Sequence, residues 1–346
     1  MIYFSCDYHY GAHPRILERL ATYNTEANVG YSMDEHTAKA KALIKSKIGR
    51  EDVDVHILVG GTQTSTTVIA AALKPYQGVL TADSGHINQH ETGAIEATGH
   101  KVIGLPGVNG KLTAEQVHEF YLAHKNNSAY EHIVMPKMVY ISNPTEVGSI
   151  YSKAELTALA KICKEDGLYL FMDGARLGYG LTSPENDLDL ETIADCCDVF
   201  YIGGTKCGAM FGEAVIITND VLKEDFRFMI KQHGGMLAKG WLLGIQYEAL
   251  FEDNLYFDIC KHANDQAMRI KKAFSDQGIL FKVDSPTNQQ FVMLTDEQAM
   301  KFADKYVVED EERALHTSPR AVRFCTSWAT KTEEVDMLIE DIKRWC

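Results

Sequence analysis

The chain has no run of about 20 consecutive apolar residues, the length that a membrane-spanning helix needs. Its first ten residues lack the basic segment, the apolar core and the small-residue cleavage site of a signal peptide, so we expect no secretory leader. Basic residues are scarce, since 34 Lys and Arg stand against 48 Asp and Glu and give a net charge of -14. Because phosphate backbones and anionic lipids attract basic surfaces, this balance argues against nucleic acid and membranes as partners.

The eight cysteines form no Cys-x-x-Cys pair, and no spacing of His and Cys has the pattern of a zinc site, so we expect no metal. Scattered thiols in a chain of 346 residues are typical of a reducing compartment, and we therefore expect a cytoplasmic protein. Cys6 and Cys207 stand out only because each falls beside a segment with site-like residues.

Short apolar runs alternate with helix-like segments through the first two thirds of the chain. This alternation is typical of a mostly parallel α/β sheet, here with about seven strands. Two of the helices are expected to begin at capping-box patterns, Thr113 to Gln116 and Ser152 to Glu155. The expected strands are residues 56–59, 79–82, 102–105, 137–141, 168–172, 199–202 and 214–217.

The last third of the chain changes character, because helices dominate residues 221–275 and two further strands are expected at 291–294 and 322–325. A final amphipathic helix is expected from about Thr332. Neither a tandem repeat nor a low-complexity linker is present. The expected division is an N-terminal arm at residues 1–30, a large domain at 31–245 and a small C-terminal α/β domain at 246–346.

Four strand ends carry polar residues where open α/β sheets bind ligands, beyond the carboxyl ends of their strands. The first is Gly60-Gly-Thr-Gln63, a strand-to-helix turn whose N–H groups and helix dipole favour an anion. It is neither a Walker A sequence nor a G-x-G-x-x-G fingerprint, so it suits a single phosphate better than a nucleotide. An ordinary glycine turn with a threonine cap fits this segment equally well when it is taken alone.

Each of the other three strand ends has a plain interpretation and a chemical one. Lys206, which follows Gly203-Gly204, is either a surface lysine or an amine desolvated against a cofactor, with a lowered pKa that suits a Schiff base. Asp173 either caps a loop or keeps a cationic ring nitrogen protonated, with Arg176 nearby as a carboxylate clamp. His86 is either a half-buried ring or a ring stacked on a planar cofactor.

A phosphate-binding turn, an aspartate and a lysine at three sheet ends form the set that pyridoxal 5'-phosphate requires. The lysine binds the aldehyde carbon, the aspartate makes the ring an electron sink, and the turn anchors the phosphate. No other common cofactor uses all three groups, so the sequence predicts pyridoxal 5'-phosphate.

From Phe4 to about Glu248, and again near Arg323, the chain resembles the threonine aldolase and β-eliminating lyase family of fold-type-I pyridoxal-phosphate enzymes. This resemblance implies a large domain with a mostly parallel sheet and a small C-terminal α/β domain. It also implies a homodimer or homotetramer whose sites are shared between subunits. The motifs that carry it are Gly61-Thr-Gln63, Gly85-His-Ile-Asn88, Met172-Asp-Gly-Ala-Arg-Leu177 and Gly203-Gly-Thr-Lys206.

The resemblance further implies a role for each site residue. Lys206 would be the Schiff-base lysine, Asp173 the partner of the pyridine nitrogen, and His86 both the stacking ring and a candidate base. His132 would reach the region of the substrate hydroxyl. The other implied cofactor contacts are Gly61, Thr62, Gln63, Arg176 and Thr205, and the implied substrate contacts are Arg176, Arg323, Ser5, Cys6 and Tyr31.

The chain departs from the family pattern at three places, because Cys6 replaces a common serine, Ser32 follows Tyr31 in place of glycine, and Asn143-Pro-Thr145 differs. These departures bear on substrate choice more than on cofactor binding. We expect cleavage of an L-3-hydroxy-α-amino acid, threonine or allo-threonine, to glycine and an aldehyde. Two alternatives stay open, namely β-elimination from serine- or cysteine-type amino acids and a cofactor-binding protein without turnover.

Overall fold

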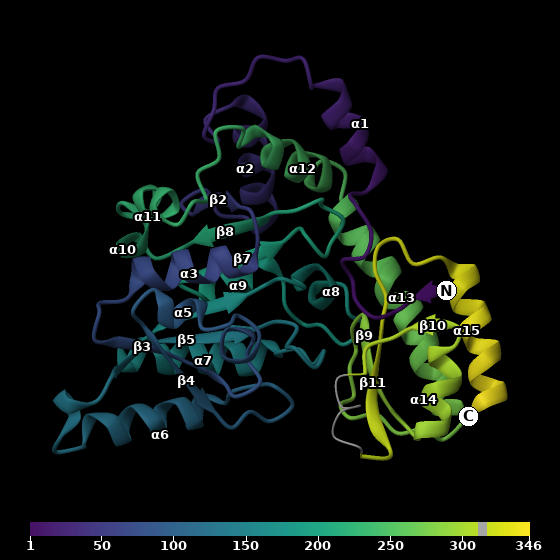
Figure 1. The fold of residues 1–346 in the computed structure, drawn as a ribbon. Coiled ribbons are helices and arrows are strands. Elements are labelled where there is room, and N and C mark those ends of the chain that lie inside the picture. The colour runs from purple at the N-terminus through teal and green to yellow at the C-terminus, as the bar shows by residue number, and fades with distance from the viewer. Residues whose placement is uncertain (311–316) are drawn as a thin grey trace.

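The computed structural model describes residues 1–310 and 317–346, and a seven-stranded sheet crosses its larger part (Figure 1). The strands are β2 (Asp54–Leu58), β3 (Gln77–Ala82), β4 (Lys101–Leu105), β5 (Met135–Ser142), β6 (Tyr169–Asp173), β7 (Val199–Gly203) and β8 (Glu213–Ile217). Their order is β2-β8-β7-β6-β5-β3-β4, with β8 antiparallel to both neighbours and every other pair parallel. The predicted mostly parallel α/β sheet is confirmed.

Alternate side chains of the strands enter two separate cores, as the two-residue period of a strand requires. In β3, for example, Leu80 belongs to one core and Val79 to the other. Both faces of the sheet are therefore covered, which explains why its strands read as continuous apolar runs. The first core includes residues of α2 (Glu35–Ile48), α7 (Lys153–Asp166), α9 (Leu190–Cys196) and α12 (Trp241–Phe251); the second includes residues of α3 (Gly61–Ala72), α5 (Ala94–Ala97) and α11 (Phe226–Gln232).

A third core lies in the C-terminal part of the chain, beside the carboxyl edge of the large sheet (Figure 1). Here β9 (Gln289–Leu294) pairs with β11 (Arg320–Cys325) in antiparallel register. The N-terminal arm joins this part, because β1 (Ile2–Tyr3) runs parallel to β10 (Tyr306–Val307). The proposed division of the chain at residues 30 and 245 stays a prediction. The helices of this third core are α13 (Leu255–Asp276), α14 (Asp296–Ala303) and α15 (Thr332–Trp345).

The two predicted capping boxes differ in outcome. Ser152 and Glu155 form the complete box at the start of α7. Thr113 caps α6 (Ala114–Lys125) by accepting from the Gln116 N–H at 3.2 Å, but the Gln116 side chain donates to the carbonyl of Pro106 instead, so half of that box is missing. The remaining helices are α1 (Pro14–Thr22), α4 (His86–Gln89), η1 (Tyr130–His132), α8 (Leu177–Leu181) and α10 (Asp220–Lys223). Over the described ranges, none of the helices combines the length and the apolar character that crossing a membrane demands.

Candidate active site

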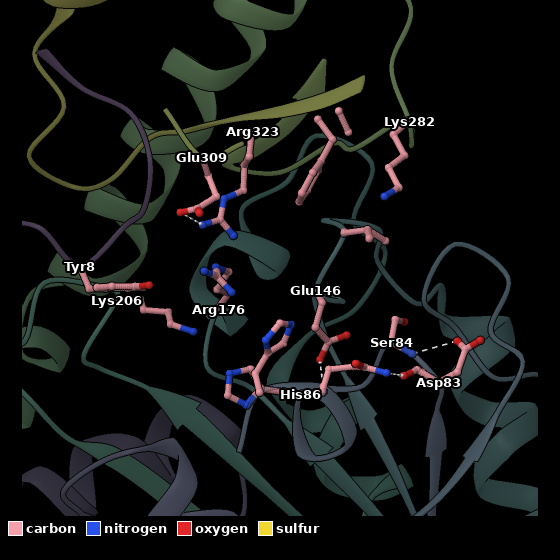
Figure 2. Close-up of a pocket in the computed structure, with 15 residues that line it drawn as sticks. Tyr8, Asp83, Ser84, His86, Glu146, Arg176, Lys206, Lys282, Glu309 and Arg323 are labelled. Carbon is pink, nitrogen blue, oxygen red and sulfur yellow. Dashed lines mark hydrogen bonds and ion pairs between the residues drawn. The ribbon is translucent and has the colours of Figure 1, made fainter. Parts of the chain in front are cut away.

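A cavity of about 740 Å³ opens where the carboxyl ends of the sheet strands face β9 and β11 (Figure 2). This is the edge at which open α/β sheets bind ligands. Four of the residues predicted from sequence line it, namely His86, Arg176, Lys206 and Arg323. Its other lining residues are Tyr8, Asp83, Ser84, Gln89, His90, Glu146, Val147, Lys282, Phe291, Glu309 and Ala321.

Lys206 reaches this cavity from a tight turn at the end of β7. A Cβ on Gly203 would lie 2.3 Å from the Ala175 carbonyl oxygen, and one on Gly204 would lie 2.7 Å from the Tyr247 hydroxyl, so only glycine fits at either position. Burial lowers the pKa of the Lys206 amine, and the charge of Arg176 lowers it further. The amine therefore carries a proton less readily than a surface lysine, as a nucleophile for an aldehyde requires.

Asp173 ends β6 on the neighbouring strand and is buried. Its Oδ1 accepts from the Ala175 N–H at 2.8 Å, and its Oδ2 accepts from the hydroxyl of Tyr140 on β5. The phenol of Tyr201 on β7 also donates to this carboxyl, and burial together with the Asp173 charge raises the pKa of both phenols. Two tyrosines thus hold the carboxylate from either side, since β5 and β7 flank β6.

The predicted phosphate turn begins α3 at the same edge of the sheet. No side chain caps the N-terminus of α3, so its first N–H groups remain for an anion. Gly61 and Thr62 supply these groups, whereas the Gln63 side chain folds back and bonds to the Val59 N–H and the His233 carbonyl. These three residues do not line the cavity but lie behind it, where Gly61 approaches the Tyr201 hydroxyl.

Thr205 also lies behind the cavity, where its hydroxyl donates to Glu213 Oε1 at 2.7 Å. Glu213 begins β8 directly opposite Gly203, and burial raises the pKa of its carboxyl to about 8. Its second oxygen, Oε2, is buried without a hydrogen-bond partner among the described residues. A protonated carboxyl at this place adds no negative charge beside Lys206 at neutral pH.

His86 stands at the first position of α4 and projects into the cavity beside Glu146 (Figure 2). Its Nδ1 lies 2.9 Å from Oε1 of Glu91, a buried carboxylate. The ring is 5.5 Å from that of His90, measured between centroids. The Glu91 contact fixes the orientation of the imidazole, so the ring presents a defined face to the cavity.

The two arginines predicted to bind a substrate carboxylate differ in their surroundings. Arg176 is already in a two-pronged ion pair with Asp7, with Nε 2.7 Å from Oδ2 and an outer nitrogen 3.0 Å from Oδ1. Arg323 instead donates to the carbonyl oxygen of Ser5 at 2.9 Å and lies 3.5 Å from Glu309. Cys6, between Ser5 and Asp7, is buried, and burial raises the pKa of its thiol. Arg323 is therefore the arginine that can bind an anionic ligand without giving up a buried, two-pronged ion pair.

The structure does not bring His132 or Tyr31 to this cavity. His132 lies in η1 just before β5 begins, at the amino edge of the sheet, whereas the cavity opens at the carboxyl edge. The strand between them spans eight residues, or about 25 Å at ~3.3 Å per residue. Tyr31 is half exposed at 47 % and lines a different, smaller cavity with Arg227.

Sequence reasoning missed several residues of the site. Glu146 lies four residues beyond Ser142, the last residue of β5, and the only available signal was its place after a strand end. Asp7 lies in the N-terminal arm, 169 residues from the arginine that it pairs with. Tyr140 and Tyr201 could not be recognised as site residues, because an aromatic residue inside an apolar strand is predicted to be part of the hydrophobic core.

The residues present fit pyridoxal 5'-phosphate. Lys206 offers a desolvated amine, Asp173 a buried carboxylate held from behind, and α3 an uncapped N-terminus. Together these are an attachment point, a partner for a ring nitrogen and an anion site, all at one edge of one sheet. In the described parts of the chain, no three His, Cys, Asp or Glu side chains gather closely enough to hold a metal ion.

Comparisons with known proteins show which family and fold this chain shares. A family model described as beta-eliminating lyase matches residues 10–297. The low specificity L-threonine aldolase of Pseudomonas sp. (strain NCIMB 10558) is 29% identical over 350 residues, which cover 98% of this chain and 96% of that protein. The solved structure of a Leishmania major threonine aldolase is 46% identical, with a TM-score of 0.96 and coverage of 99% of each chain. An aspartate aminotransferase from Thermus thermophilus, 13% identical with a TM-score of 0.71 and coverage of 100% and 92%, shares the fold.

Proposed function

The chain belongs to the beta-eliminating lyase family, and from this premise we propose that it cleaves the Cα–Cβ bond of an L-3-hydroxy-α-amino acid. The products are glycine and an aldehyde, and the substrate we propose is threonine or allo-threonine. Similarity to threonine aldolases along nearly the whole chain supports this choice. The observation that carries the proposal is the buried amine of Lys206, which shares one cavity with His86 and Arg323.

The cofactor is pyridoxal 5'-phosphate, and when bound it supplies an electron sink for the pair released as the Cα–Cβ bond breaks. Lys206 would hold it covalently and would give way to the amine of the substrate. Asp173 would keep a proton on the ring nitrogen, since its own position is fixed by Tyr140 and the Ala175 N–H. The N-terminus of α3 would bind the phosphate through backbone N–H groups.

Arg323 would bind the substrate carboxylate, because its present partners are mainly neutral oxygen atoms. Arg176, which lies near Arg323 in the cavity (Figure 2), would add a second contact without leaving Asp7. Two arginines around one carboxylate fix the amino acid by its Cα substituents and leave its side chain directed toward His86 and Glu146.

We further propose a homodimer or homotetramer that works in the cytoplasm. Tyr31 lies away from the cavity of its own chain and is half exposed, so we expect it to act at the site of a second subunit. The free thiols of all eight cysteines support a reducing compartment. Sedimentation of the purified protein, together with the activity of a Tyr31→Ala variant, tests the shared site.

The holoprotein is incubated with L-threonine and the products are identified. Acetaldehyde and glycine in equal amounts support the proposal, whereas ammonia and 2-oxobutyrate would make the protein a β-eliminating lyase on this substrate. Lys206→Ala should abolish turnover and the visible absorbance of the covalently held cofactor. Near-normal turnover in that variant would refute the role of Lys206.

A further inference from the structure

We propose that the carboxylate of Glu146, rather than a histidine, takes the proton from the β-hydroxyl of the substrate. This inference rests on the proposed function, because that reaction begins with the loss of a hydroxyl proton. A retro-aldol cleavage needs one base near the β-carbon, and a glutamate in the cavity wall is a residue of the right kind.

Glu146 is positioned by two hydrogen bonds that come from two different strand ends. The Ser142 hydroxyl, at the end of β5, donates to Oε1 at 2.6 Å, and the backbone N–H of His86 donates to the same oxygen at 2.9 Å. Because both bonds end on Oε1, the other oxygen is left to face a ligand. Figure 2 shows the carboxyl beside the His86 ring, on the side of the cavity opposite Arg323.

The surroundings make this carboxylate a stronger base than a surface glutamate. Burial raises the pKa of the Glu146 carboxyl, the Ser142 hydrogen bond opposes the rise, and the charge of Asp173 adds to it. A higher pKa brings the group nearer to the working pH, where a general base is most effective. The titratable and charged groups that face it are His86, His90, Glu91, Tyr140, Tyr151 and Asp173, and Arg176 and Lys206 share its cavity.

Neither histidine considered from the sequence serves this role as well. His132 lies at the amino edge of the sheet, at the other end of β5. His86 uses Nδ1 for Glu91. A ring that lies flat over a cofactor turns its face, not a nitrogen lone pair, toward the bond that breaks. Glu146 accepts from the backbone N–H of His86 and lines the same cavity, so its carboxyl is available to a hydroxyl bound there.

The cleavage step conserves protons and electrons. The hydroxyl proton moves to Glu146, and the electron pair of the O–H bond becomes the second carbon–oxygen bond of the aldehyde. The pair that joined Cα to Cβ stays with Cα, which takes up one proton as glycine forms. No oxidant, reductant or added water is required.

The test compares Glu146→Gln with the wild-type holoenzyme in two reactions. Wild-type cleavage of L-threonine is measured first, since its absence would refute the proposed function itself. In the variant, kcat for cleavage should fall at least about 100-fold. Exchange of the glycine α-proton with deuterated solvent should stay within about three-fold of the wild-type rate, because exchange needs no hydroxyl base. If the variant cleaved L-threonine with the wild-type kcat, or if it lost both cleavage and exchange, the proposed role of Glu146 would be overturned.

A second readout does not depend on catalysis. The folded-state pKa of Glu146 lies above its ordinary value of 4.5, so ionisation of this carboxyl lowers the stability of the wild type as pH rises above about 4.5. The Tm of Glu146→Gln relative to wild type should therefore increase from pH 4.5 toward neutral pH. A difference that stays constant with pH would contradict the argument. Glu119→Gln, an exposed change on α6, is the matched control and should show neither effect.

Ser142→Ala distinguishes a base from a merely structural residue. The variant keeps the carboxyl but loses the hydrogen bond that lowers the Glu146 pKa. The acidic limb of the kcat profile should therefore move to higher pH, while cleavage remains measurable. An unchanged limb would mean that Glu146 is not the titrating base.

Discussion

The ion pair between Asp7 and Arg176 offers the sharpest test of how the site is held together. Asp7 is only 2 % exposed, and it accepts two hydrogen bonds from the guanidinium and one from the Asn288 amide at 3.0 Å. Burial alone would raise the pKa of Asp7, but the charges of Arg176 and Lys206 outweigh it and lower that pKa. Asp7→Asn removes the charge and keeps the shape, so it leaves the buried guanidinium of Arg176 without its ion-pair partner.

Removing one partner of a buried ion pair lowers the free energy of unfolding by about 3–5 kcal/mol, because the remaining charge is left unpaired in a medium of low dielectric constant. We therefore expect the free energy of unfolding of Asp7→Asn to fall by about that amount at pH 7. The Lys206 amine should also lose a proton more readily, since the nearby carboxylate opposes the lowering of its pKa in the wild type. Urea denaturation gives the first quantity, and the pH dependence of cofactor binding gives the second.

The control is Asp253→Asn, which removes an ion pair with Arg15. The Asp253 side chain is 68% exposed, so this pair lies at the surface. This change should cost no more than about 1 kcal/mol. The folded-state pKa of Asp7 lies below its unfolded value of 3.8, so its stabilisation is complete above about pH 4 and is lost as pH falls through the folded-state pKa. Wild type and Asp7→Asn should converge in acid. A cost below about 1 kcal/mol at pH 7 would refute the reasoning.

Three further outcomes follow from the geometry. Tyr140→Phe removes a hydroxyl that holds Asp173, and cofactor affinity should weaken about 5-fold in a binding titration, by ~1 kcal/mol. Gly178→Ala places a Cβ 2.5 Å from the Cys260 sulfur and should lower stability by about 1–3 kcal/mol in urea denaturation. His56 is buried with its pKa lowered from 6.5 to about 3, so wild-type stability should fall as pH drops from 6.5; thermal melts of His56→Gln should lack that slope.

The fold could be predicted because its strands are buried on both faces. Such strands appear in the sequence as short apolar runs, and all seven expected positions correspond to strands of the large sheet. What sequence could not supply is the order of the strands or the pairing of β1 with β10, which joins residues about 300 positions apart. The incomplete capping box at Thr113 failed for a local reason, since the Gln116 side chain found another acceptor.

The candidate site was predictable where chemistry sits directly after a strand. Lys206 and Asp173 have that position, and the structure places both of them at the carboxyl edge of the sheet. As a candidate base, the sequence indicates His132, which precedes β5, and not Glu146, which follows β5. Because parallel strands gather their carboxyl ends at one edge, a residue after β5 meets the cavity of its own chain, whereas a residue before β5 lies at the other edge of the sheet.

The pairing of Asp7 also decides which arginine attracts a substrate carboxylate more strongly. A ligand that drew Arg176 away from Asp7 would leave a buried carboxylate without its cation, at a cost of several kcal/mol. Arg323 can turn to a ligand without breaking a close ion pair, because it donates to the Ser5 carbonyl and approaches Glu309 only at 3.5 Å. The same residue type thus has two roles. Arg176 fixes the N-terminal arm to the end of β6 and shapes the cavity wall, and Arg323, whose only ion pair among the described residues is the 3.5 Å contact with Glu309, supplies the charge that binds a carboxylate ligand.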